Sequence, residues 1–440
     1  NRPKPAAEPS PTPRVVIVGA GFAGLAAAKA LRGKDADVLL VDRQNYHTFL
    51  PLLYEVAAAG LEPDDIAQPV RAILRGAPNI RFLMASVEGI DRAARTVRTS
   101  VRDVSYDYLV LAPGSVTNYF GLDSVAGRAL GLKDLHEATA VRNRILRNFE
   151  RATLETDPDE QARLMTMVVI GGGPTGVELA GALAELKRHV LPRDYPDLGL
   201  ARARVVLVEA LDHVLSAMPE RLQRKAVRQL EQLGVEVRLG AAVADVSERG
   251  VRLRTGEEVP AANVVWVAGV RGDPLGGTLG AEVGPSRRVR VTPALHLPGD
   301  ERVFVAGDLA LLEGADGRPL PMMAPVAMQQ GALAATNVLR AARGQPMKPF
   351  RYRDRGSMAT VGRKMAVAHV FGLQFSGLIA WILWLFVHLL QLVGLRNRAL
   401  VLVNWTWNYV RYDRANRLVT DAPARSGPLE ATTGAGRAAG

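Results

Sequence analysis

Residues 14–24 read RVVIVGAGFAG, and this stretch decides the fold. The β-branched run at 15–18 predicts a short buried strand, and the LAAAKAL that follows predicts a helix. Between them, Gly19, Gly21 and Gly24 form the pattern G-x-G-x-x-G, with Phe22 and Ala23 inside it. The first glycine permits a tight turn, the second lets a pyrophosphate approach the backbone, and the third lets helix and strand pack closely.

A second apolar run at 38–41 ends at Asp42, 18 residues beyond Gly24. An acid in this place accepts hydrogen bonds from a ribose. Glycine-rich turns also occur by chance, so the fingerprint gains its weight from the order strand, glycines, helix, strand and acid. This order predicts a dinucleotide-binding domain.

The motif recurs later in the chain. Residues 167–170 (MVVI) predict a strand, GGGPTG follows at 171–176, and VELAGALAELKRHV predicts a helix. A further strand at 205–208 ends at Glu209, which lies 33 residues past Gly176. This spacing is longer than usual, and Pro192 and Pro196 indicate that a loop takes up the excess.

Two dinucleotide sites on one chain imply electron transfer between two dinucleotides. In this architecture the N-terminal site usually holds FAD. Glu209 favours NADH over NADPH at the second site, because a carboxylate repels a 2′-phosphate. We therefore predict an α/β fold with two Rossmann-like dinucleotide-binding domains and a C-terminal amphipathic helical region.

Composition excludes several functions. The chain of 440 residues has no cysteine, which rules out disulfides, Cys-ligated zinc, iron–sulfur clusters and a catalytic thiol. Its seven histidines are scattered, so we expect no metal. Lys and Arg exceed Asp and Glu by 55 − 44 = 11, which suits nucleic acid or an anionic membrane surface. No nucleic-acid-binding motif occurs, so we expect no nucleic acid partner.

Shorter motifs extend the pattern. LVLAPGS at 109–115 resembles the crossover between domains in the two-dinucleotide-binding flavoproteins, and VWVAGV at 265–270 resembles its counterpart after the NADH domain. VFVAGDL at 303–309 resembles the segment whose acid, here Asp308, meets the ribitol and pyrophosphate region of FAD. Disulfide reductases and sulfide:quinone oxidoreductases of this superfamily need redox cysteines, which this chain lacks.

Three longer stretches narrow the resemblance. They are NYHTFLPLLYEVAAAGL at 45–61, APVAMQQG at 324–331 and SGLIAWILWLFVHLLQLVGLRNRALVLVN at 376–404. Together they resemble type II NADH:quinone oxidoreductases, the non-proton-pumping respiratory NADH dehydrogenases, from about residue 14 to 418. The resemblance implies a tightly bound FAD, NADH as co-substrate and a quinone as acceptor.

The expected organisation follows this resemblance. It comprises a flexible tail at 1–13, an FAD-binding domain at 14–117 and 286–345, an NADH-binding domain at 118–285, a membrane-anchoring region at 346–420 and a disordered tail at 421–440. Candidate FAD-binding residues are Gly19, Gly21, Phe22, Ala23, Gly24, Asp42, Arg43, Pro51, Leu52, Ala112, Gly114, Asp308 and Ala324. Candidate NADH-binding residues are Gly171, Gly173, Pro174, Thr175, Gly176, Glu209, Ala268 and Gly269.

The expected quinone side involves Glu178, Gln329 and Gln330. Quinone reduction needs protons, and Glu178, expected on the first turn of its helix, is the candidate relay; alternatively it stabilises a helix N-terminus. Gln329 is a candidate quinone or flavin contact, or else an ordinary polar helix residue. The family commonly has A-Q-x-A-x-Q here, and this chain carries Pro325 at the first Gln position.

The C-terminal region is expected to lie on a membrane. No formal charge occurs from 365 to 395, and residues 371–395 are compatible with one helix of about 37 Å. A helical wheel separates an apolar face from a mildly polar stripe that carries Trp381 and Trp384, and Trp405 and Trp407 follow. Because Trp prefers the headgroup boundary, we expect helices in the interface, with a buried dimer or core helix and a true span as alternatives.

The resulting hypothesis is a peripheral, monotopic NADH:quinone oxidoreductase on the cytoplasmic face of the membrane, which we expect to be a homodimer. The alternative is a soluble NADH reductase of a ferredoxin- or rubredoxin-type acceptor. A non-catalytic FAD- or NADH-sensing protein is a third possibility. The amphipathic C-terminus argues against the second hypothesis, and two complete fingerprints argue against the third.

Overall fold

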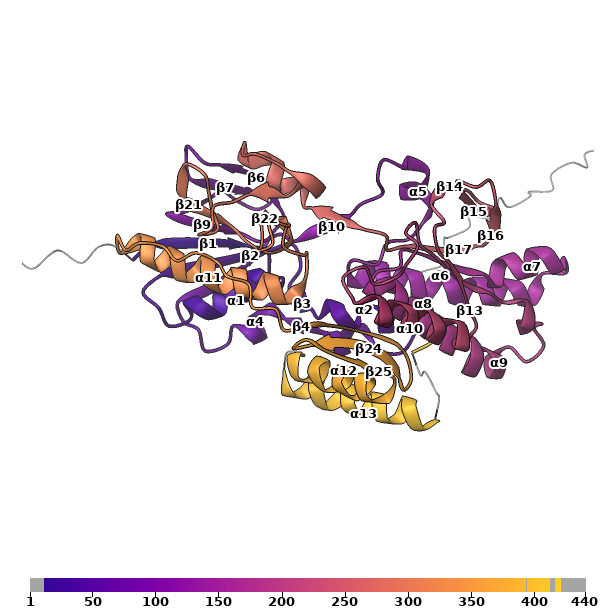
Figure 1. The fold of residues 1–440 in the computed structure, drawn as a ribbon. Helices are drawn as coiled ribbons and strands as arrows, with labels where there is room; N and C mark the ends of the chain where they lie inside the picture. Colours follow the sequence, from indigo (N-terminus) through magenta and orange to yellow (C-terminus); the bar gives the residue numbers. More distant parts are fainter. Residues whose placement is uncertain (1–11, 393, 412–415, 421–440) are drawn as a thin grey trace, which may run out of the picture.

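The computed structural model describes residues 12–392, 394–411 and 416–420, so the predicted tail at 421–440 and nearly all of the tail at 1–13 lie outside the described residues. Figure 1 shows two α/β units joined side by side, with the C-terminal helices beneath the junction. The first unit is built on a six-stranded sheet in the order β20-β21-β9-β1-β2-β5. Its strands are β1 (Arg14–Val18), β2 (Asp37–Asp42), β5 (Ile80–Met84), β9 (Tyr108–Leu111), β20 (His296–Leu297) and β21 (Asp300–Val305).

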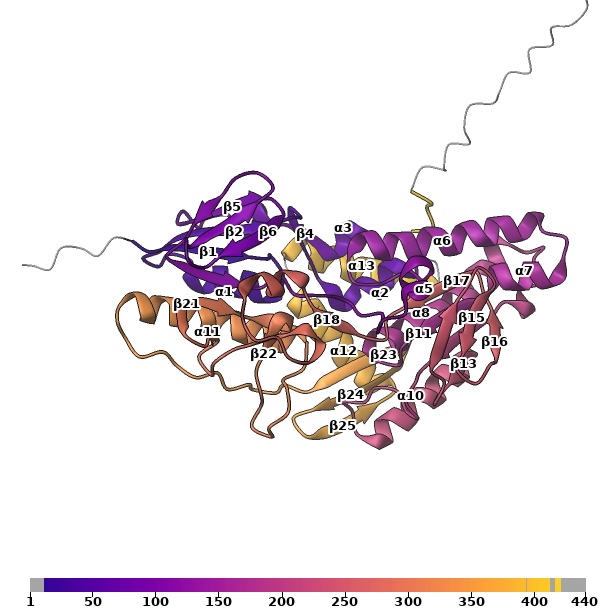
Figure 2. The same cartoon turned by 90° about the horizontal axis from the view of Figure 1, so that it is seen from above.

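The first unit is assembled from two distant parts of the chain. Residues 14–111 supply four strands, and β21 returns to pair in parallel with β9. Helices α1 (Phe22–Leu31) and α11 (Ala324–Ala342) pack against each other, as Figure 2 also shows. Their backbones approach closely, because a Cβ on Gly331 would lie 2.0 Å from the carbonyl oxygen of Ala23.

The second unit has a four-stranded parallel sheet in the order β13-β12-β11-β17. Strands β10 and β18 pair antiparallel where the chain crosses between the units. The elements of this part are β10 (Ser115–Thr117), α5 (Asp123–Arg128), α6 (Leu135–Leu154), α7 (Pro158–Met165), β11 (Met167–Ile170), α8 (Pro174–His189), α9 (Leu191–Asp194), β12 (Val205–Val208), α10 (Glu220–Leu233), β13 (Val235–Arg238), β14 (Val243–Val246), β15 (Gly250–Leu253), β16 (Glu258–Pro260), β17 (Asn263–Trp266) and β18 (Val270–Gly272).

Smaller elements line the junction and the edges. After β2 come β3 (Tyr46–Thr48), α2 (Leu53–Ala57), α3 (Pro63–Ile66), β4 (Ala67–Pro69), α4 (Val70–Ile73), β6 (Val87–Asp91), β7 (Thr96–Thr99) and β8 (Val104–Ser105). Strands β19 (Val289–Arg290) and β22 (Ala310–Leu311) pair in parallel.

The C-terminal region differs from the single helix expected over residues 371–395. Its antiparallel sheet contains β23 (Ser357–Gly362), β24 (Met365–Val370) and β25 (Leu373–Ser376), and α12 (Leu378–Gln391) and α13 (Leu395–Arg411) follow. The expectation was wrong for Leu373–Ser376, which pair with β24. Gly377, with φ +71°, then turns the chain into a helix of only 14 residues. An uncharged apolar run is compatible with either a strand or a helix. Pairing with β24 therefore determined that these residues form a strand.

Two of the four tryptophans of this region are buried, whereas Trp407 is 54% exposed. Trp384 and Trp405 are 1% and 4% exposed, and they join a core cluster that extends to Val177 and Leu179 of α8. The predicted apolar face of α12 does point outward: Leu378, Ile379, Ile382, Phe386 and Leu390 are 50–61% exposed. Among the described helices, none is long and apolar enough to cross a bilayer.

Candidate functional site

Two glycine loops in the two units share one backbone geometry. Gly19 has φ +98° and Gly171 has φ +118°. A Cβ on Gly19 would lie 2.2 Å from the carbonyl oxygen of Ala112, and a Cβ on Gly171 would lie 2.5 Å from the Cα of Ala268. Glycine is therefore required at both positions, for the left-handed conformation and for the close approach of the neighbouring strand end.

The next glycine of each loop faces open space. Gly21 precedes α1 and Gly173 precedes α8, and a Cβ on either would meet no heavy atom within 4 Å. Pro174 and Thr175, at the start of α8, are exposed. The N–H groups of both helix N-termini thus border a space that a pyrophosphate can enter. Further along, the absent side chains at Gly24 and Gly176 let each helix cross its own glycine turn.

In each unit, an acidic residue at the end of the second strand accepts hydrogen bonds from backbone N–H groups of the glycine loop and of the residues that follow the acid. The Asp42 carboxylate accepts hydrogen bonds from the backbone N–H groups of Ala20 (2.6 Å) and Gln44 (2.8 Å). Glu209 accepts from the N–H groups of Gly172 (2.5 Å) and Leu211 (2.8 Å). Burial raises the pKa of Asp42, and the two N–H donors oppose this rise.

Asp308 lies beside the first loop, at the end of β21. Its Oδ2 accepts a hydrogen bond from Ser115 Oγ (2.5 Å) and lies 3.6 Å from Lys133 Nζ. Ser115 directly follows Gly114, so the crossover segment and the returning strand meet at this carboxylate. The chain therefore brings Asp308, Ala112 and the first glycine loop into one place, as the candidate FAD residues require.

The two glutamines of α11 hold backbone segments. Gln330 is fully buried, and its Oε1 accepts from the N–H of Gly307 (2.8 Å), next to Asp308. Gln329 forms a pair with the backbone of Arg353: Nε2 donates to the carbonyl (3.1 Å) and Oε1 accepts from the N–H (3.0 Å). Ala324 is the first residue of the same helix.

The remaining FAD candidates lie near the first loop or at its rim. Leu52 is fully buried and Pro51 is half-buried. Arg43 is largely exposed, 4.0 Å from Asp134. Sequence reasoning missed His47, whose Nδ1 lies 3.0 Å from the carbonyl oxygen of Ala20 in the loop. Burial lowers the pKa of His47 to about 4, so its ring is neutral at pH 7. Only its position before the FLPLL segment could have drawn attention to it.

A chain of aromatic rings leads from the first loop to the C-terminal helices. Phe22 meets Phe49 edge-on at 6.1 Å between centroids, and Phe49 meets His388 of α12 at 6.2 Å. His388 stacks on Trp384 at 4.2 Å, and Trp384 contacts Trp405 of α13 at 5.7 Å. The C-terminal helices are therefore packed into the wall of the candidate site.

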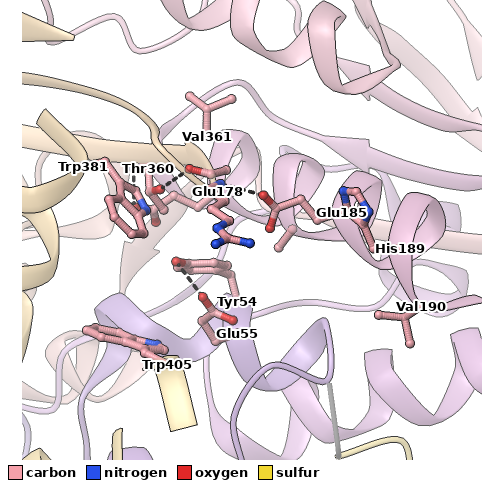
Figure 3. Close-up of a pocket in the computed structure, with 13 residues that line it drawn as sticks. Tyr54, Glu55, Glu178, Glu185, His189, Val190, Thr360, Val361, Trp381 and Trp405 are labelled. Carbon is pink, nitrogen blue, oxygen red and sulfur yellow. Dashed lines mark hydrogen bonds between the residues drawn. The ribbon is translucent and has the colours of Figure 1, made fainter. Parts of the chain in front are cut away.

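Glu178 lies in the second turn of α8, not in the first as expected, because the helix begins at Pro174. It is 8% exposed and lines a cavity of about 50 Å³ between α8, α2, β23 and the C-terminal helices (Figure 3). Its Oε1 accepts from the N–H of Thr360 (3.4 Å). Close packing of α8 on β23 requires Gly181, where a Cβ would lie 1.7 Å from the carbonyl oxygen of Val361.

Burial is the main cause that raises the pKa of Glu178 well above its usual range. The N–H of Thr360 and the indole of Trp384 oppose this rise, whereas nearby Glu55 adds to it. The indole N–H of Trp384 is buried and forms no hydrogen bond, so Trp384 lowers the pKa of Glu178 only by lying close to its carboxylate. The protonated carboxyl is thus favoured, as a proton donor requires.

Comparison with known proteins agrees with this geometry. Residues 13–331 match the model of the pyridine nucleotide-disulphide oxidoreductase family, and residues 355–411 match the NDH2 C-terminal domain. The type II NADH:quinone oxidoreductase Ndh of Mycobacterium tuberculosis is 39% identical over 436 residues, which cover 96% of this chain and 93% of the relative. This chain belongs to the type II NADH:quinone oxidoreductase family.

Other members of this family are similar over most of their length. NdhA of M. tuberculosis is 40% identical over 424 residues, covering 92% of this chain and 89% of that protein. Among solved structures, NDH2 from Plasmodium falciparum in complex with NADH has a TM-score of 0.84 over 93% of this chain and all of that chain, at 17% identity. The sulfide:quinone oxidoreductase of Aquifex aeolicus, with a TM-score of 0.69 over 93% of both chains at 19% identity, shares the fold.

Proposed function

We propose that this protein oxidises NADH and reduces a membrane quinone by two electrons, using FAD and without pumping protons. The observation that carries the proposal is a pair of matching dinucleotide cradles in one chain, with apolar-faced C-terminal helices packed beside them. The family of the chain supports the same reaction. Absence of cysteine excludes the thiol chemistry found elsewhere in this fold.

The first cradle fits FAD. Gly21 leaves open space at the N-terminus of α1, where a pyrophosphate is stabilised. Asp42 and Asp308 provide carboxylates for the ribose and ribitol hydroxyls, and Ala112, Gly114 and Ala324 border the same region. When bound, FAD supplies the two-electron chemistry that connects NADH to quinone.

The second cradle fits NADH. Gly173 leaves the corresponding space before α8, and Glu209 takes the place of Asp42. A carboxylate here accepts the ribose hydroxyls of NADH and repels the 2′-phosphate of NADPH. Ala268 and Gly269, at the end of β17, form the neighbouring wall at the switch point of the sheet, where nucleotides bind.

Glu178 delivers a proton to the quinone side in this proposal. It is buried, burial raises its pKa, and it is adjacent to the C-terminal helices that this proposal places against the membrane. Gln329 and Gln330 shape the N-terminal part of α11, which would approach the flavin. Gln330 accepts a hydrogen bond from the backbone N–H of Gly307, and Gln329 donates one to the backbone carbonyl of Arg353.

The exposed apolar face of α12 and α13 is the proposed membrane contact. We also propose that the protein is a peripheral homodimer on the cytoplasmic face of the membrane. Besides α12, Phe371, Leu402, Val403 and Trp407 are 52–81% exposed. Exposed large apolar side chains gathered on neighbouring elements are typical of a membrane or protein contact. Arg396 is exposed at the start of α13 and suits anionic headgroups.

The decisive experiment records the flavin spectrum of the purified protein during turnover. Addition of NADH under anaerobic conditions should bleach the flavin absorbance, and a quinone should restore it. Liposome flotation should recover the protein with anionic vesicles. Bleaching by NADH without recovery on adding quinone, together with recovery by a ferredoxin, would favour the soluble-reductase alternative.

A further inference from the structure

The cavity at Glu178 continues along one face of α8. Glu178, Ala182, Glu185 and His189 all line it, and their spacing of four, three and four residues places them in one stripe of the helix. Eleven residues at a rise of 1.5 Å give this stripe a length of about 16 Å. Glu178 is buried, whereas Glu185 and His189 are half-buried. Glu185 and His189 are therefore more accessible to water than Glu178.

The groups that face this stripe come from α2, from β23 and the turn after it, and from the C-terminal helices, which supply Trp381 and Trp405. Tyr54 and Glu55 lie on α2, with Tyr54 Oη donating to Glu55 Oε1 (3.2 Å). Arg363 follows β23, and its backbone N–H donates to Glu185 Oε1 (2.5 Å). Figure 3 shows Glu178 and Glu185 on α8, two turns apart, with His189 beyond them and Tyr54 and Glu55 across the cavity. Three carboxylates and one imidazole thus line a single cavity, together with Arg363.

The cavity is suited to water. Its volume of about 50 Å³ exceeds the roughly 10–15 Å³ that one water molecule needs. Trp405 lines the cavity, is 4% exposed, and has an indole N–H with no hydrogen-bond partner in the protein. A buried donor without an acceptor is normally satisfied by an ordered water.

The reaction requires a supply of protons from water. In the balanced equation, NADH + H⁺ + quinone gives NAD⁺ + quinol, so one hydrogen arrives with the hydride and one proton is taken from water. Glu178 is only 8% exposed between α8, α2, β23 and the C-terminal helices, so proton exchange with bulk water is expected to pass through this cavity.

We propose that Glu185 and His189 form the entrance of a water-filled proton route along α8, which reloads Glu178 from the aqueous side after each turnover. His189 accepts a proton at the half-buried end, Glu185 passes it on through cavity water, and Glu178 releases it toward the quinone. This inference rests on the proposed function. Glu185 and His189 touch neither substrate nor cofactor in this scheme, so they are proton carriers and not catalytic residues.

The test separates electron transfer from proton uptake. Full-length Glu185→Gln, His189→Ala and the double variant are reduced anaerobically by NADH and mixed rapidly with either a short-chain benzoquinone or ferricyanide, in H₂O and in D₂O. Ferricyanide accepts electrons without protons. Glu185→Gln keeps the carbonyl oxygen that accepts from Arg363, so the fold is preserved. Arg188→Gln, exposed on the next face of the same helix, is the matched control.

Reoxidation by the quinone should slow roughly tenfold or more in both single variants, with a larger solvent isotope effect. Reoxidation by ferricyanide and the Arg188→Gln control should stay unchanged. Added imidazole should rescue His189→Ala, which a purely structural role would not allow. Unchanged quinone reoxidation and isotope effect in the double variant would overturn the route. If Glu178→Gln still slows quinone reoxidation in that case, the proposed function stands without this entrance.

Discussion

The two dinucleotide-binding units have the same cradle and different surroundings. In both, a left-handed glycine packs on a neighbouring strand end, an open glycine starts the helix, and a strand-end acid binds the loop N–H groups. The helices then differ two residues after the last glycine, where α1 has Ala26 and α8 has Glu178. The cradle does not require an acid there. Glu178 therefore reflects the second unit's contact with β23 and the C-terminal helices.

Alanine at the open glycine of each cradle should give the largest effects. Gly21→Ala and Gly173→Ala both have room for the new methyl group, so both variants should fold. Gly21→Ala should lose FAD and all activity. Gly173→Ala should keep FAD and raise the KM for NADH by roughly a hundredfold, through displacement of the pyrophosphate. Flavin content and steady-state kinetics measure these effects, and loss of the same ligand by both variants would contradict two separate cradles.

Glu178→Gln should slow reoxidation by quinone about 10²–10⁴-fold, because a proton donor is removed. Reduction of the flavin by NADH should stay near normal. Burial raises the pKa of Glu178, and the protonated form is the active one, so wild-type reoxidation should fall as pH rises through that pKa. The Gln variant should lose this pH dependence. Stopped-flow absorbance resolves the two half-reactions, with exposed Glu231→Gln as the control. Slowed flavin reduction with normal reoxidation would mean that Glu178 acts in the oxidation of NADH and not in the reduction of quinone.

The C-terminal helices pack on the second unit's core, and their outer face can be tested separately. Ile382→Ser and Phe386→Ser should each weaken liposome binding by about ten- to a hundredfold. This factor corresponds to the free energy of about 1.5–3 kcal/mol gained when one apolar side chain leaves water. Leu154→Ser, on a side chain that is 84% exposed on α6, is the control. Flotation with anionic vesicles measures the effect. Equal losses in all three variants would mean that hydrophobicity in general, and not this face, governs binding.

Glu209→Gln should narrow the preference for NADH over NADPH in kcat/KM by roughly ten- to a hundredfold, or about 1–3 kcal/mol. The change removes repulsion of the 2′-phosphate. Asp42→Asn, at the matching position of the other cradle, should leave this preference unchanged. A wild-type enzyme that uses both nucleotides equally well would refute the assignment.

Gln329→Ala should have the smallest effect. Its amide already binds Arg353, so the variant should slow quinone reoxidation by roughly five- to tenfold, about the value of one net hydrogen bond. Rapid mixing with quinone measures this change, and flavin reduction by NADH is the internal reference. A loss as large as that of Glu178→Gln would show that Gln329 contacts the quinone directly.

The sequence by itself determined the two cradles, because glycine spacing, strand length and the strand-end acid are local properties. The two-unit α/β fold followed from them, and the stretches at 45–61, 324–331 and 376–404 indicated the family. Only the tertiary structure decided the rest. Leu373–Ser376 became a strand because β24 was available as its partner. Trp384 was buried because α12 packs on β23, β24 and α13, which brings its ring against Tyr54 of α2 and Trp405. The cavity joining Glu178 to Glu55, Glu185 and His189 depends on long-range packing between α8, α2 and β23, which no local pattern encodes.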